Sequence, residues 1–218
     1  MKLTVFNGSP RGKSSNSTRM IPWIISSEGN NETAMEEICY LNKLSAHENY
    51  LKKAQSAEGF LFVFPLYVDS MPGITKSFFE LMEKHKVIFS GKPVYFIIHS
   101  GFPEMIQSKT LSRYLGYFSS KVMAMDYKGT VIIGGSESLQ MAPDGAYRKL
   151  QSHLKIVGNS IKNREMIPDN TNLLINKRDR LTAFQQFIFT INPLKNFYWN
   201  YRAKQQGIKI DLTDQPYA

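Results

Sequence analysis

Residues 59–67, GFLFVFPLY, are apolar almost throughout, and this run constrains the fold more than any other part of the sequence. A strand with one wet face alternates apolar and polar side chains, whereas a parallel strand covered on both faces is apolar at successive positions. Residues 92–100, KPVYFIIHS, form a second run of the same kind. The chain is therefore expected to build a parallel sheet that is covered on both faces.

Segments with apolar residues at helical spacing separate the strand-like runs. Strands are expected at 2–6, 36–41, 59–67, 92–100 and 127–135, and helices at 17–27, 47–56, 73–85, 107–122 and 145–162. Pro22 is expected in the first turn of its helix, where a missing N–H is tolerated. The alternation predicts an α/β fold with a doubly wound five-stranded parallel sheet and helices on both faces. Ligands of such sheets bind beyond the carboxyl ends of the strands.

The composition narrows the class of protein. No apolar run approaches the ~18 residues of a membrane span, and the N-terminus breaks too soon at Asn7-Gly8 for a secretory signal, so a cytoplasmic protein is expected. The single cysteine, Cys39, excludes a disulfide framework, a zinc cluster or a protein-ligated iron–sulfur cluster within one chain. Cys39 is expected to be buried and inert, and no metal site is expected.

The C-terminal part differs from the rest in charge and in aromatic content. From Arg148 onward there are 12 Lys and Arg against 5 Asp and Glu, which is +7 of the net charge of +9. No nucleic-acid-binding module accompanies this charge, so no nucleic-acid partner is expected. Aromatic residues, Trp199 among them, lie between basic ones over residues 180–204. Packing over the domain, a dimer contact and a membrane-surface helix remain open, with the dimer preferred and the membrane least favoured.

The loop NGSPRGKSSNS, residues 7–17, resembles a nucleotide triphosphate loop but lacks its spacing. That loop has four residues between its glycines, whereas Gly8 and Gly12 enclose three. None of the apolar strands ends in the Asp that would help to hold Mg²⁺. The dinucleotide fingerprint G-x-G-x-x-G is absent as well. The loop therefore predicts neither an ATPase or GTPase nor a bound dinucleotide.

What remains is a strand followed by a hydroxyl-rich loop that opens a helix. Helix N-termini offer free N–H groups and a favourable dipole for an anion, and Arg11 adds a forked cationic contact. These donors suit a single terminal phosphate. The alternative is that the hydroxyl and amide residues only cap the helix. A cap needs one or two such residues, and the loop has several, so phosphate binding is favoured.

Together with FVFPLYVDSMPGITKSFFE and IIHSGFPE, this loop resembles the flavodoxin-like NAD(P)H-dependent FMN reductase family, including its iron–sulfur flavoprotein branch. The resemblance covers roughly residues 1–165. It implies noncovalent FMN, with the phosphate at Ser9, Arg11, Ser15, Asn16, Ser17 and Thr18. It places the isoalloxazine ring beside Pro65, Leu66, Tyr67, Val68, Ser70 and Met71, and beside Ser100, Gly101 and Phe102.

The family's activity would be hydride transfer from NAD(P)H to FMN and onward to a quinone, a nitro or azo compound, or free flavin. The cofactor performs this chemistry, so no catalytic side chain is expected. A homodimer is expected. The cluster cysteines of the iron–sulfur branch are missing, and residues 166–218 form a basic, aromatic, helical extension outside the match, expected to pack on the domain or a partner. The alternatives are a flavodoxin-like electron carrier, against which the pI of 9.5 counts, and a flavin-free interaction module.

Two further features of the sequence each have two interpretations. His99 ends an apolar strand and is expected to be a core histidine with satisfied hydrogen bonds rather than a catalytic group. Gly134-Gly135-Ser136 ends the fifth strand and either borders the substrate entrance or only makes the turn.

Overall fold

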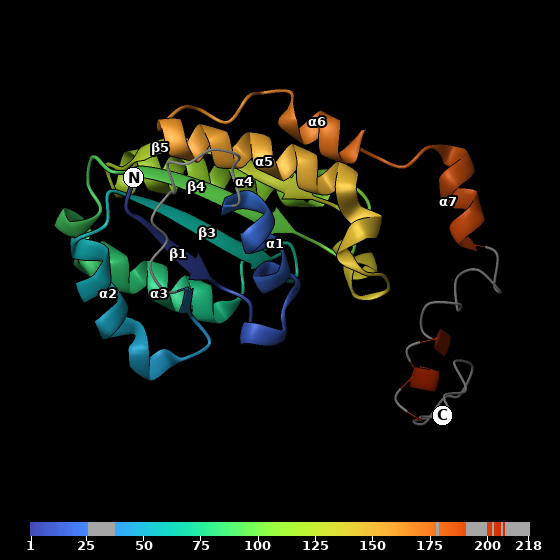
Figure 1. Cartoon of the computed structure of the whole chain (residues 1–218), viewed down its shortest axis with the longest axis horizontal. Coiled ribbons are helices and arrows are strands. Elements are labelled where there is room, and N and C mark those ends of the chain that lie inside the picture. Colours follow the sequence, from blue (N-terminus) through green and yellow to red (C-terminus); the bar gives the residue numbers. More distant parts are fainter. Residues whose placement is uncertain (26–37, 178, 191–199, 202, 206, 208–218) are drawn as a thin grey trace. The chain divides into compact units, whose positions relative to one another are not determined.

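The structure, a computed structural model, describes residues 1–25, 38–177, 179–190, 200–201, 203–205 and 207. Its sheet has the order β2-β1-β3-β4-β5, and every neighbouring pair of strands is parallel (Figure 1). The strands are β1 (Leu3–Asn7), β2 (Cys39–Tyr40), β3 (Gly59–Pro65), β4 (Pro93–His99) and β5 (Asp126–Ile133). The predicted five-stranded parallel sheet is confirmed, and its order is that of flavodoxin-like folds.

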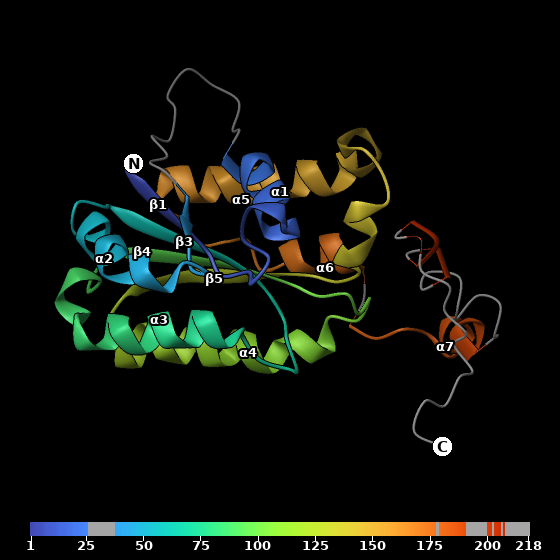
Figure 2. The same ribbon diagram turned by 90° about the horizontal axis from the view of Figure 1, so that it is seen from below.

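Helices cover both faces of the sheet. Figure 2 shows α1 (Asn16–Ile25) and α5 (Arg148–Asn163) on one face, and α3 (Gly73–Lys84) and α4 (Ile106–Tyr117) on the other. The helix α2 (His47–Gln55) packs into the same core cluster as α3 and α4. Each predicted helix therefore forms within the described residues, although positions 26–27 of the first predicted helix and 36–37 of the second predicted strand lie outside them. The strand ends lie between the two layers of helices.

The position of β3 between two cores explains why its sequence is apolar throughout. Phe60, Phe62 and Phe64 point into the cluster under α3, and Leu61 and Val63 point into the cluster under α1 and α5. All five are fully buried, and burying such a side chain stabilises a fold by about 1.5–3 kcal/mol. Alternate residues therefore fill two separate cores.

The crossing of α1 and α5 depends on a glycine. A Cβ atom at Gly158 would lie 1.9 Å from the carbonyl oxygen of Ile24, so only glycine permits this approach. The approach joins the C-terminal end of α1 to α5, and both helices pack against the same core cluster.

Helix α1 corrects one expectation. Because the helix begins at Asn16, Pro22 lies in its second turn rather than its first. The ring is on the exposed side of the helix, so the carbonyl that loses its N–H partner can bond to water. The buried face of α1, which includes Met20, Ile21 and Ile24, holds the helix on the sheet despite the missing bond.

The first compact unit of the chain ends at Asp179, and a second runs from Arg180 to Ala218. The expected boundary after residue 165 falls inside the first unit, because α6 (Thr171–Asn176) bonds to the outer edge of β5 through Asn172 and Asn176. In the second unit α7 (Ala183–Thr190) exposes Phe184 and Phe187, while the aromatic residues at 197–199 lie outside the described residues.

No helix in the described part of the chain is both long enough and apolar enough to cross a membrane. Cys39 is buried, as expected.

Candidate functional site

The first loop is built around the side chain of Asn7 at the end of β1. Its Oδ1 accepts a hydrogen bond from the Ser9 amide at 2.9 Å, and its Nδ2 donates to Thr18 Oγ1 at 2.9 Å. Ser15 Oγ donates to the Gly12 carbonyl at 2.6 Å and accepts from the Thr18 amide at 3.2 Å. The hydroxyls of Ser15 and Thr18 therefore shape the loop and cap α1.

The start of α1 leaves two amides directed at the loop. The first four N–H groups of a helix have no partner inside it. The amides of Thr18 and Arg19 bond to Ser15, whereas among the described residues no acceptor is recorded for the amides of Asn16 and Ser17. These two N–H groups and the helix dipole make a site for an anion, and the exposed Arg11 lies beside it.

His99 links the first loop to the end of β5. Its Nε2 is 2.8 Å from Ser17 Oγ, and its Nδ1 is 3.0 Å from Ser136 Oγ. Burial, together with the positive charge of Arg11, lowers the pKa of His99 to about 3. The ring is therefore neutral at ordinary pH, and it is a core histidine with both nitrogens bonded, as expected.

The second loop turns sharply after β3. The backbones of Tyr67 and Ser70 exchange two hydrogen bonds, and Val68 and Asp69 between them have φ angles of 48° and 58°. Two left-handed residues make a tight hairpin turn, and a β-branched residue there costs about 1–2 kcal/mol. Val68 is 99% exposed, whereas Met71 packs into the core. The strain lies next to the strand end where a ligand is expected.

The third loop follows β4 and the fourth loop follows β5. Together they extend the pairing of these two strands beyond the strand ends. The Ser100 amide donates to the Ile133 carbonyl at 2.9 Å, and the Ser136 amide donates to the Ser100 carbonyl at 2.7 Å. Asn16 Nδ2 donates to the Ser136 carbonyl at 2.8 Å. The loop after β5 is thus fixed to both β4 and α1, and Ser136 and Glu137 become part of the site.

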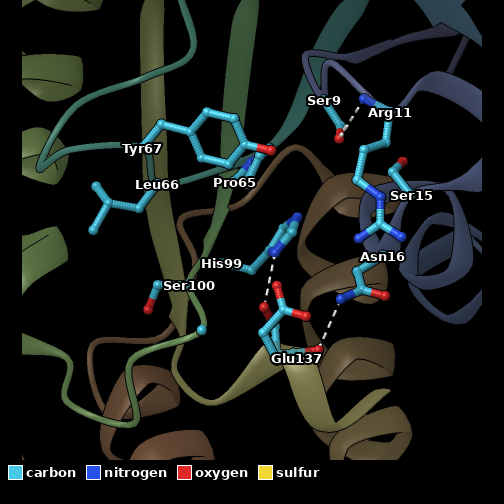
Figure 3. A pocket seen from close by; sticks show the side chains of 12 residues that line it. Ser9, Arg11, Ser15, Asn16, Pro65, Leu66, Tyr67, His99, Ser100 and Glu137 are labelled. Atoms are coloured by element: carbon cyan, nitrogen blue, oxygen red, sulfur yellow. Dashed lines mark hydrogen bonds between the residues drawn. The ribbon is translucent and has the colours of Figure 1, made fainter. Parts of the chain in front are cut away.

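These loops enclose a pocket at the carboxyl edge of the sheet (Figure 3). It holds about 400 Å³ of empty space, part of it open to solvent. The sequence-predicted residues that line it are Ser9, Arg11, Ser15, Asn16, Pro65, Leu66, Tyr67, Ser100 and Gly101. The pocket is lined in addition by His99, Ser136 and Glu137.

The other predicted residues lie around this pocket rather than in its lining. Ser17 and Thr18 support the first loop, and Val68 and Phe102 are exposed beside the pocket, Phe102 to 59%. Ser70 closes the hairpin, and Met71 is buried in the core. The sequence feature that could have indicated Ser136 and Glu137 is their position after the fifth strand. Gly134-Gly135 before them is equally typical of an ordinary turn, so the sequence alone does not assign them to the site.

Two of these features together define a class of protein. The sheet order and a phosphate-type loop at the end of β1 are those of flavodoxin-like proteins that bind a mononucleotide. In the described part of the chain, no group of three His, Cys, Asp or Glu side chains is placed to hold a metal ion.

A sequence model of the family described as NADPH-dependent FMN reductase matches residues 1–123, which is more than half of the chain. The chain belongs to this family. It is an oxidoreductase whose cofactor is FMN and whose reductant is NAD(P)H.

Solved structures share the fold. An NADPH-quinone reductase from P. pentosaceus is 17% identical with a TM-score of 0.56, and the match covers 74% of this chain and 97% of that chain. An FMN-dependent NADH-azoreductase from Bacillus anthracis, in complex with FMN, is 16% identical with a TM-score of 0.55, covering 74% and 99%. The Trp repressor binding protein from Bacillus subtilis is 22% identical with a TM-score of 0.50, covering 61% and 84%. The comparison with curated proteins gives no match.

Proposed function

We propose that this chain takes hydride from NAD(P)H onto FMN held in the pocket of Figure 3 and passes it to a small-molecule acceptor: a quinone, a nitro or azo compound, or free flavin. The observation that carries the proposal is the arrangement of that pocket. Anion donors lie at one end, and apolar or aromatic side chains and loop backbone lie at the other.

The phosphate end consists of donors from one loop. The amides of Asn16 and Ser17, the Ser9 hydroxyl and the Arg11 guanidinium would hold the phosphate, with Ser15 and Thr18 keeping the loop in shape. The neutral His99 adds no second positive charge. This donor set fits one phosphate monoester, which needs no metal ion.

The ring end would be formed by Pro65, Leu66 and Tyr67 on one side and by Ser100 and Gly101 on the other. When bound, FMN supplies the hydride chemistry itself, so the chain needs to bind and orient it. Tyr67 is 44% exposed, and Val68 and Phe102 next to the pocket are more exposed still. NAD(P)H and the acceptor would therefore reach the same open side in turn.

The visible absorption spectrum of the protein with FMN tests this proposal. Flavin bands are expected to change on binding and to bleach when NADPH is added without air. Arg11→Ala is expected to weaken FMN binding roughly 10- to 100-fold, since it removes a charge-assisted contact to phosphate. Lys13→Ala is the matched control, because Lys13 is an exposed cation of the same loop that does not line the pocket. Absence of FMN binding by the wild-type protein would refute the proposed function.

A homodimer is proposed as the assembled state. Phe184 and Phe187 on α7 are 71% and 62% exposed, and large exposed aromatic side chains of this kind are common at contacts between chains. Light scattering should give a mass near twice that of the 25.0 kDa chain. A mass that stays monomeric as the concentration rises would contradict the dimer.

A further inference from the structure

Glu137 is the acidic side chain among the described residues that line the pocket. It lies in the first turn of a short 3₁₀ helix, Ser136–Gln140, that follows β5. The residue before it is held by Ser100, by Asn16 and by His99. The loop next to Glu137 is thus fixed by three hydrogen bonds, and Glu137 lines the pocket from it.

Gly101 makes room for this carboxylate. A Cβ atom at Gly101 would lie 3.0 Å from Glu137 Cγ, closer than side-chain carbons normally approach. Gly101 is not among the glycines with a left-handed backbone, so its conformation does not require glycine. A Cβ atom there would require the Glu137 side chain to shift by a few tenths of an ångström. Glu137 therefore packs closely against the third loop at Gly101.

A carboxylate in this pocket has an electrostatic cost. Beside the neutral His99, the pocket is lined by the guanidinium group of Arg11 and the carboxylate of Glu137. A phosphate bound near Arg11 is repelled by Glu137, and a phosphate at neutral pH offers few donors in return. The cost is offset if the ligand also brings hydroxyl groups, because hydrogen bonds to an ionised acceptor are strong.

The position of Glu137 matches the part of FMN that carries hydroxyls. In Figure 3 Glu137 lies between Asn16, at the phosphate end, and Ser100, at the ring end, next to His99. In FMN the segment between phosphate and ring is a sugar-alcohol chain. The carboxylate therefore lies beside the segment of the ligand that is rich in donors.

We infer that Glu137 is a specificity-determining residue: it accepts hydrogen bonds from the sugar-alcohol hydroxyls of the bound flavin, and it disfavours phosphate ligands that lack such hydroxyls. This inference rests on the proposed FMN site and adds to it a residue that selects the ligand.

Binding of three probes separates the two effects of Glu137. Glu137→Ala is expected to weaken FMN and riboflavin binding by about tenfold, the value of one hydrogen bond to a charged acceptor. The same change should leave inorganic phosphate binding, measured by competition with FMN, unchanged or tighten it about threefold, because repulsion is removed. Glu137→Gln keeps an acceptor without the charge, so its loss for flavins should be smaller. Quenching of flavin fluorescence on binding is the readout, with no turnover involved.

The outcomes are distinct. Equal weakening of all three probes would mean that the loop had collapsed, and unchanged flavin binding would mean that Glu137 does not contact the ligand; either result overturns the inference. Wild-type protein that binds no flavin would instead overturn the proposed function. Glu83→Gln, an exposed acid on α3 outside the pocket, is the control for charge alone.

Gly101→Ala provides an independent check. In the wild-type background the added methyl group should push the Glu137 side chain aside and weaken FMN binding severalfold. In the Glu137→Ala background nothing crowds the methyl group, so the same change should cost less. Equal losses in both backgrounds would contradict the pairing of Gly101 with Glu137.

Discussion

Replacing Asn172 and Asn176 together by alanine is expected to lower the free energy of unfolding by about 3–5 kcal/mol. The reason is the outer edge of β5, the last strand of the sheet. Asn172 Oδ1 accepts from the Ile132 amide at 2.7 Å, and its Nδ2 donates to the Thr130 carbonyl at 3.0 Å. Asn176 repeats the pattern one step along, with the Gly134 amide at 2.8 Å and the Ile132 carbonyl at 2.7 Å.

Each side-chain amide thus replaces a peptide group of a missing neighbouring strand. The geometry permits this because four residues of a helix rise by about 6 Å, close to the roughly 6.6 Å between alternate residues of a strand. Alanine at both positions would leave two N–H groups and two carbonyls of the edge without these partners. Unpaired edge groups also invite pairing with a second molecule, so the variant is expected to self-associate as well.

Urea unfolding measures the loss, and light scattering at rising concentration measures the association. Asn170→Ala is the control, because Asn170 precedes the same helix, is exposed and makes no capping bond with its side chain. A double variant within about 1 kcal/mol of wild type would show that water replaces the two side chains at little cost.

The hydrogen bonds of Asn172 and Asn176 to the outer edge of β5 illustrate what the sequence could not predict. Strands β3 and β4 are recognisable because they are buried on both faces and are apolar at nearly every position. Helix α6 has six residues and no comparable pattern. Its value lies in two amides whose partners are more than 40 residues away in β5. Such a contact depends on the register of the sheet, which local sequence does not determine.

The candidate site, too, has parts that the sequence predicted and parts that it did not. The first three loops were predicted because glycines, hydroxyls and a proline mark them in the sequence. The fourth loop contributes Ser136 and Glu137, but a glycine pair after a strand is also an ordinary turn. The part played by His99 required the structure, because its partners Ser17 and Ser136 come from two other strand ends.

His99 gives the second large effect, a pH dependence of stability. In the unfolded chain its pKa is about 6.5, whereas in the folded protein burial and Arg11 lower the pKa to about 3. Between these values the unfolded chain binds a proton that the native protein does not. The stability that neutral His99 contributes is therefore complete above about pH 6.5, and it falls by up to about 1.4 kcal/mol per pH unit below it.

His99→Gln removes this titration and keeps one donor and one acceptor for Ser17 and Ser136. Between about pH 7 and pH 5, without added FMN, the wild-type protein should lose about 2 kcal/mol more unfolding free energy than His99→Gln. Urea unfolding at both pH values provides the comparison. His99→Leu should cost about 2–4 kcal/mol at pH 7, because two buried hydroxyls lose their partner. At pH 5 its cost should be about 2 kcal/mol smaller, because leucine does not titrate. It should weaken FMN binding too, since Ser136 lines the pocket and Ser17 supports the first loop.

The same slope in wild type and His99→Gln would assign the acid sensitivity to other groups. In that case His99 would be protonated within the folded protein at moderate pH, next to Arg11. Two adjacent cations at the phosphate end would then strengthen FMN binding as the pH falls. The neutral ring predicts instead that FMN affinity follows only the protonation of the phosphate itself, so the pH profile of binding separates the two cases independently of the unfolding data.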